Sequence, residues 1–95
     1  MNINFSNADL KGANLSRLDL RGSNFTDANL ENTNLSYSSL SDVDFRNANL
    51  TNVNFSGSFL SAANMLGSKR DGVIWDGSTG TPELESNQGR FGKKQ

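Results

Sequence analysis

The chain has 95 residues, 34 % of them hydrophobic, with nine basic and ten acidic side chains and a formal net charge of −1. This length suffices for one domain, and the scattered charge forms no basic stripe, which argues against direct nucleic-acid binding. The sequence contains no cysteine or histidine, so disulfides and the Ser–His and Cys–His pairs of hydrolytic enzymes are excluded.

The N-terminal residues enter a regular apolar pattern by Phe5, which leaves no room for a signal peptide. No apolar run approaches the length of a membrane span. We therefore expect a cytoplasmic protein, or a domain of a longer chain, without a membrane partner.

From the N-terminus onward, a large apolar residue returns at every fifth position. An α-helix repeats every 3.6 residues and a strand every 2 residues, and a spacing of five fits neither period. The pattern therefore indicates neither an amphipathic helix nor an ordinary half-buried strand. It is an internal repeat, and such a repeat determines the fold. The thirteen repeating residues, called centres below, form the predicted core ladder: Phe5, Leu10, Leu15, Leu20, Phe25, Leu30, Leu35, Leu40, Phe45, Leu50, Phe55, Leu60 and Met65.

Two positions before a centre stands a residue that is usually small or β-branched, such as Ala8 before Leu10. On an extended segment these two side chains point the same way, so each unit directs one large and one small residue inward. The residue between them points outward and is usually Asn or Asp; Phe59 is the exception.

Two positions after the centre, ten of the thirteen units have Gly, Asn or Asp. These residues tolerate the positive φ that the second central residue of a type II turn demands, so the chain should bend every five residues. Arg17, Tyr37 and Ala62 depart from the rule. Arg17 and Tyr37 are twenty residues apart, and we predict that they share a corner with a different turn.

The centres also indicate the number of sides. Phe5, Phe25 and Phe45 recur every twenty residues, and stacking of like on like at that step predicts a coil with four sides. The same register places Lys11 beside Glu31, and Asp19 lies between two arginines; we expect weak surface ion pairs. Thirteen units make about three coils.

Four segments show the repeat most clearly: Ala8-Asp9-Leu10, Ala13-Asn14-Leu15, Ala28-Asn29-Leu30 and Ala48-Asn49-Leu50. They resemble the pentapeptide-repeat family, whose pattern is a small residue, Asp or Asn, Leu or Phe, and two variable residues. The resemblance covers residues 3–67 and implies an all-β fold, a right-handed quadrilateral parallel β-helix (a solenoid). The general preference for right-handed parallel crossovers supports the same hand.

The pattern is expected to stop after Gly67, which divides the chain into a β-helix (1–67), a capping segment (68–82) and a flexible tail (83–95). Val73, Ile74 and Trp75 form the apolar cluster that we expect to cap the last coil.

The sequence offers no catalytic, cofactor-binding or metal-binding residues, so we expect no enzyme and no cofactor. Asp42 and Asp44, and Asp71 and Asp76, are the paired carboxylates. They lack the spacing of a calcium loop, and we interpret them as solvated residues of turns.

Candidate interface residues are of two kinds. Tyr37 and Phe59 are outward-type aromatics, and Phe59 could equally pack under the tail. The exposed end of the first coil should present Ile3, Phe5 and Leu10, since the ends of a solenoid are adhesive. This predicts a homodimer through a coil end, or one domain of a larger protein.

The resulting hypothesis is a non-catalytic structural or protein-interaction module with an unidentified protein partner. The resemblance implies an alternative, a DNA mimic that regulates or protects a DNA topoisomerase (gyrase). Residues 1–66 carry six acidic and four basic side chains, a charge density far below that of duplex DNA. A minor alternative is an ice- or surface-binding solenoid, although a regular threonine array is missing.

Overall fold

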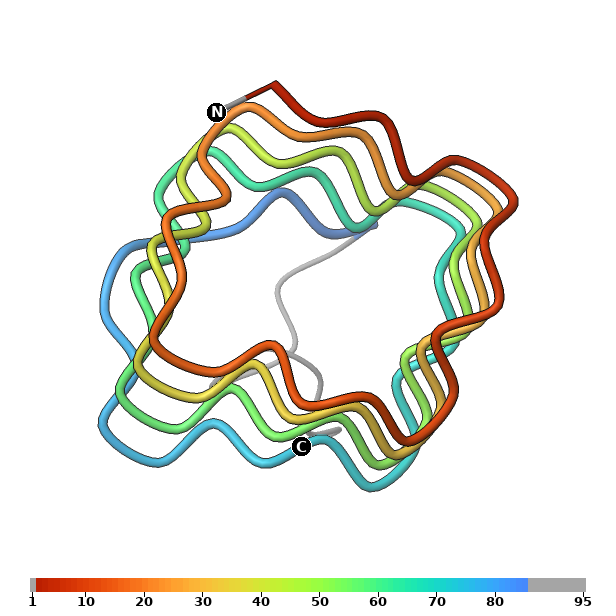
Figure 1. Cartoon of the computed structure of the whole chain (residues 1–95). Helices are drawn as coiled ribbons and strands as arrows, with labels where there is room; N and C mark the ends of the chain where they lie inside the picture. The colour runs from red at the N-terminus through yellow and green to blue at the C-terminus, as the bar shows by residue number, and fades with distance from the viewer. Residues whose placement is uncertain (1, 86–95) are drawn as a thin grey trace.

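The computed structural model describes residues 2–85. Seen from the N-terminal end, the chain runs clockwise around four sides as it recedes, so the coil is right-handed (Figure 1). Successive layers pair in parallel at a step of twenty residues, as Asn4 does with Asn24 and Asn24 with Asp44. The right-handed quadrilateral β-helix is therefore confirmed.

Each side of the coil is a short extended segment with one bridging residue, and residues 2–85 contain no helix, hence none that could cross a membrane. We number the coils 1 to 4 (residues 3–22, 23–42, 43–62 and 63–81) and name the sides A to D by their bridging residues. Side A holds Asn4, Asn24, Asp44, Asn64 and Glu83; side B holds Asp9, Asn29, Asn49 and Lys69; side C holds Asn14, Asn34, Asn54 and Ile74; side D holds Asp19, Ser39, Phe59 and Thr79.

The centres fill the inside of the coil. From Leu20 to Met65 each centre is at most 3 % exposed, whereas the first three centres are half-buried because no layer covers coil 1. On side A the rings of Phe5, Phe25 and Phe45 stack with centroids 4.8 and 5.3 Å apart. Such ring pairs add about 0.5–1.5 kcal/mol each to the burial of their surface.

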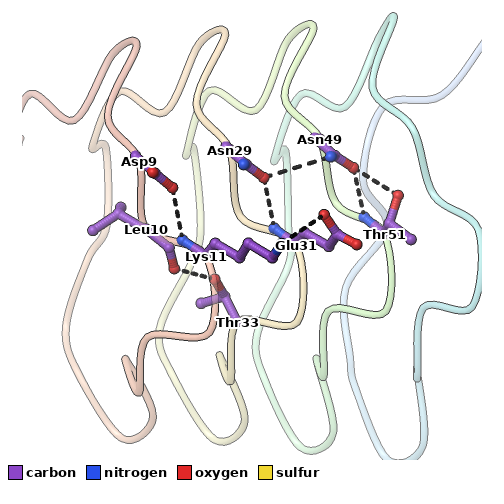
Figure 2. A network of polar contacts seen from close by, with 8 residues as sticks. All are labelled: Asp9, Leu10, Lys11, Asn29, Glu31, Thr33, Asn49 and Thr51. Atoms are coloured by element: carbon purple, nitrogen blue, oxygen red, sulfur yellow. Dashed lines mark hydrogen bonds and ion pairs between the residues drawn. The ribbon is translucent and has the colours of Figure 1, made fainter.

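The outward Asn and Asp residues cap the corners. The side-chain Oδ1 of Asn34 accepts a hydrogen bond from the backbone N–H of Ser36, two residues later, at 2.9 Å. Figure 2 shows the same bond from Asp9, Asn29 and Asn49, stacked along side B. This local bond is why short polar side chains precede the centres, a role beyond the outward orientation that the sequence predicts.

The corner residues from Asn7 to Gly77 all have a positive φ, as the spacing of Gly, Asn and Asp predicts. Arg17 and Tyr37, with φ of 61° and 58°, share it. The prediction of a different turn at this corner is therefore wrong as far as the sign of φ is concerned. The hydrogen bonds between coils hold all corners in the same left-handed conformation.

That corner does differ in its hydrogen bonding. At most corners a backbone bond closes the turn, as from Ser58 N to Phe55 O at 3.0 Å, but Leu18 does not form this bond with Leu15, nor does Ser38 with Leu35. Instead Leu18 N donates to the Ser38 hydroxyl at 3.2 Å, and that hydroxyl donates to Leu15 O at 2.8 Å. The next coil thus supplies the group that closes the turn.

The coil continues beyond Gly67, where the sequence predicts that it gives way to a cap. Lys69, Ile74, Thr79 and Glu83 bridge to the preceding layer, so the structure has a fourth coil and one further side. This coil is hard to recognise in the sequence because some residues at the positions of its centres are polar or irregular. The corner residues Gly67, Gly72 and Gly77 nevertheless keep the five-residue spacing and a positive φ. The final step is nineteen residues, from Asn64 to Glu83, which ends the regular register.

The C-terminal end is closed partly by polar groups. Arg70 stands in the column of Leu50, at the position of a centre, and its guanidinium donates to Met65 O at 2.8 Å. It also pairs with the Glu85 carboxylate at 2.8 Å, whose second oxygen accepts the Gly67 N–H. These bonds, first the Gly67 amide and then Arg70, lower the pKa of Glu85 to about 2.

The predicted apolar cap is incorporated into this last coil. Val73 and Trp75 pack against the core, with the Trp75 ring stacked on Phe55 at 5.3 Å. Ile74 bridges on side C with its side chain outward and 43 % exposed, because it occupies the position of the outward Asn residues. Of the predicted tail, Leu84 packs against the core, and residues 86–95 lie outside the described residues.

Candidate interaction surface

Side D is the place where the outward polar ladder breaks. In coils 1 to 3 the outward residues of sides A, B and C are all Asn or Asp, whereas side D has Asp19, then Ser39 and Phe59. Neither Ser39 nor Phe59 supplies the carboxyl or amide oxygen that caps the other corners. Phe59 is 52 % exposed. On side D an exposed aromatic ring therefore stands where other sides have a side chain that caps the backbone N–H two residues later.

The corner before side D carries the second exposed aromatic. Tyr37 is 56 % exposed, and the guanidinium of Arg17 lies over its ring, 4.8 Å from the centroid. The ring leans towards coil 3, where a Cβ atom on Gly57 would lie 2.4 Å from its Cε1 atom. The absent side chain of Gly57 thus makes room for the ring of Tyr37.

These contacts place both aromatics on one part of the surface. The ring of Tyr37 lies over Gly57, which is only two residues before Phe59. We call Arg17, Tyr37 and Phe59 the side-D patch. The sequence indicates both aromatics as interface candidates but not the stacking of Arg17, which the twenty-residue register could have shown.

The charges beside the patch are partly neutralised. Arg21 donates from Nε and Nη2 to the two oxygens of Asp19, at 2.8 and 2.7 Å. The guanidinium of Arg21 holds the pKa of Asp19 well below its usual value. Arg17, which the sequence places beside Asp19, has no ion pair among residues 2–85. The patch therefore presents one cation together with two aromatic rings.

The other predicted interface residues lie elsewhere, at the open end of coil 1. Ile3 is 40 % exposed, while Phe5 and Leu10 are half-buried against the core. The structure thus separates the five candidates into two regions, the N-terminal end and the side-D patch. Whether Phe59 packs under the tail involves residues outside the described part of the chain.

One of the paired carboxylates, Asp44, is bonded to a neighbouring arginine. Asp44 accepts hydrogen bonds from the guanidinium and then from the backbone N–H of Arg46, and these bonds lower its pKa. No group of three or more acidic side chains in residues 2–85 lies close enough to hold a metal ion. Side B is similarly structural: Lys11 and Glu31 form the predicted weak pair at 3.9 Å (Figure 2).

The family assignment follows from the repeat. A family model described as the pentapeptide repeat region matches residues 1–75. The chain belongs to the pentapeptide-repeat family. No curated protein matches it significantly.

Several solved structures are similar to this pentapeptide-repeat chain. HetL, a pentapeptide repeat protein involved in heterocyst differentiation regulation in the cyanobacterium Nostoc sp. strain PCC 7120, is 26 % identical over 79 % of this chain and 37 % of its own, with a TM-score of 0.43. QnrB1, a plasmid-mediated fluoroquinolone resistance protein, is 22 % identical over 84 % of this chain and 59 % of its own, with a TM-score of 0.45. A thylakoid-lumen pentapeptide repeat protein of Arabidopsis thaliana is 29 % identical over 80 % and 60 %, with a TM-score of 0.32. This chain thus spans less than two thirds of the length of each.

Proposed function

We propose that this protein is a rigid, non-catalytic interaction module that binds a partner protein through the side-D patch. The observation that supports the proposal is the presence of two side chains that are more than half exposed, Tyr37 and Phe59, where the outward pattern departs from the repeat. Local departures from an otherwise consistent sequence are expected at functional sites. Tyrosine and arginine are also enriched among the residues that dominate protein–protein binding energy.

The scaffold supports this role because it holds the patch in place. Arg17 and Tyr37 stand in consecutive coils, fixed by backbone bonds from Arg17 N to Ser36 O and from Tyr37 N to Ser56 O, at 2.9 and 2.7 Å. A rigid aromatic anchor loses little conformational entropy on binding. The expected partner surface offers an apolar pocket for the rings and a carboxylate for Arg17.

Binding can be tested with variants that restore the repeat. A tagged full-length chain is used to capture a partner, and the purified partner is then titrated by calorimetry against the wild type and a Tyr37→Asn/Phe59→Asn double variant. Asn is the residue found at equivalent corner and outward positions, so the fold should persist. Loss of two central aromatic anchors should weaken binding at least about thirtyfold.

Ile74→Asn is the matched control, because it also replaces an exposed apolar outward residue by Asn, but on side C. Its affinity should stay within about threefold of the wild type, well under 1 kcal/mol. Equal affinities for the wild type and the double variant, or a loss confined to Ile74→Asn, would contradict the proposal.

The DNA-mimic alternative has weaker support. Of the ten charged side chains in residues 1–66, six are joined in three ion pairs of opposite sign, and the net charge is only −2. A supercoiling assay with gyrase should therefore show neither inhibition nor protection by this chain.

A further inference from the structure

The N-terminal end of the coil has an open backbone edge on all four sides. In coil 2 the backbone N–H and C=O groups of each bridging residue both form hydrogen bonds with coil 1. Asn24, for example, donates to Ile3 O and accepts from Phe5 N. Among residues 2–85 the equivalent residues of coil 1 have no such neighbour, and within this range their backbone N–H and C=O groups make no backbone hydrogen bond. They are Asn4, Asp9, Asn14 and Asp19.

These free groups are well suited to an antiparallel neighbour. When one residue directs both its N–H and its C=O to the same side, an antiparallel strand can satisfy both groups from a single facing residue. A parallel neighbour must instead supply the two groups from different residues, as Ile3 and Phe5 do for Asn24. Each side of coil 1 thus offers a self-complementary pair of groups.

A second copy in the opposite orientation provides such antiparallel edges. The chain runs clockwise when viewed from its own N-terminal end (Figure 1). Two copies placed with these ends together, around a two-fold axis, therefore bring their sides into contact in antiparallel directions. Roughly eight hydrogen bonds become available, two for each of the four sides.

The inward side chains fit the same arrangement. If Asp9 faces Asn14 of the second copy, the large Leu10 lies opposite the small Ala13, and Ala8 lies opposite Leu15. Large residues thus meet small ones on sides B and C. On sides A and D the same register makes Asn4 face Asp19 and brings the apolar Phe5 opposite Leu18. The end is also apolar, with Ile3 and Leu18 40 % and 43 % exposed and the first three centres half-buried.

The C-terminal end is closed at the corner that follows side A. The Gly67 N–H that would face a further layer is bonded to the Glu85 carboxylate, and Arg70 is held by Met65 and Glu85. The nineteen-residue step to Glu83 also breaks the register that a following coil requires. Head-to-tail stacking would therefore have to displace these contacts, whereas one N-terminal edge complements another without displacing them.

We propose that two copies of this chain associate head to head through the N-terminal edges of coil 1, by antiparallel pairing on the four sides. This dimer is independent of the side-D patch, which lies along the flank of the coil. Sealing both open edges stabilises the protein against uncontrolled strand addition.

Sedimentation of the full-length chain over a range of concentrations tests the proposal. The wild type should approach twice the mass of one chain, 10.3 kDa. Leu18→Glu places a charge on the N-terminal edge and should weaken association at least about tenfold, whereas Ile74→Glu should not; the two side chains are equally exposed, at 43 %. Circular dichroism verifies that both variants retain the fold.

A second pair of variants tests the backbone pairing itself. Asn14→Pro removes an edge N–H and Asn14→Ala does not, while both remove the Oδ1 cap on Ser16. Association should weaken in the proline variant and remain near wild type in the alanine variant. A wild type that stays monomeric at the highest concentrations, or a dimer sensitive to Ile74→Glu and not to Leu18→Glu, would overturn the proposal.

Discussion

Replacing Ser38 by alanine should destabilise the protein more than the same change at Ser58. Both side chains are 0 % exposed and stand in one column, one coil apart. The Ser38 hydroxyl links Leu18 N to Leu15 O, two backbone groups that have no bond to each other. The Ser58 hydroxyl donates to Phe55 O, which already accepts the Ser58 N–H.

The expected magnitudes follow from these partners. Without its hydroxyl, Ser38→Ala leaves a donor and an acceptor unsatisfied, at a cost of about 1–3 kcal/mol for such a group, reduced where water reaches the exposed Leu18. Ser58→Ala leaves every backbone group of its corner bonded. It should cost less than about 1 kcal/mol, because buried alanines already occupy equivalent positions.

Urea unfolding followed by the fluorescence of Trp75, the sole tryptophan, gives both free energies of unfolding. The comparison requires that the free energy of unfolding fall with urea concentration at the same slope in the two variants. Equal losses at Ser38 and Ser58 would refute the reasoning, because they would mean that the corner at Leu18 closes by the ordinary backbone bond once the hydroxyl is removed.

Three further results are expected in the same assay. Phe45→Ala should cost about 3–5 kcal/mol, whereas Phe5→Ala should cost about half as much because its ring is only half-buried; equal costs would show that the end is covered. The folded-state pKa of Glu85 lies below its ordinary value of 4.5, so its carboxylate stabilises the fold above that pH and the stability is lost as the pH falls towards 2. The difference between wild type and Glu85→Gln should therefore shrink on acidification, and a constant difference would contradict the assignment. Gly12→Ala and Gly80→Ala both introduce the strain of a positive φ, about 1 kcal/mol. Of the two, only Gly80→Ala would also bring its methyl group into collision with the main chain of the preceding coil. Similar losses of unfolding free energy in the two variants would therefore be inconsistent with the structure.

The repeat itself could be predicted because it is set by local rules. A centre such as Phe45, a small residue before it and a corner residue after it each follow from side-chain size and backbone preference. The fourth coil is hard to predict because Arg70 and Gly80 occupy positions where an apolar centre is expected. The core tolerates Arg70 there because it is the last layer, where Glu85 and a carbonyl group can satisfy the charge.

The candidate surface could be predicted only in part. Tyr37 and Phe59 depart visibly from the repeat, so the sequence identifies them. Their proximity depends on the direction in which the ring of Tyr37 leans, which is set by the empty space at Gly57 and by the guanidinium of Arg17. Side-chain rotamers of this kind follow from neighbours one coil away and cannot be read from local spacing.

The step of twenty residues has a consequence for how this protein can change in length. Inserting twenty residues at a corner would add one coil. Each column of stacked inward residues would stay continuous, and Phe25 would still stack on a residue of its own column. Inserting five residues would turn everything that follows by a quarter revolution, so Tyr37 and Phe59 would come to face different directions if the insertion fell between them. Selection that preserves the patch should therefore reject five-residue insertions between Tyr37 and Phe59, although the repeat unit itself would allow them.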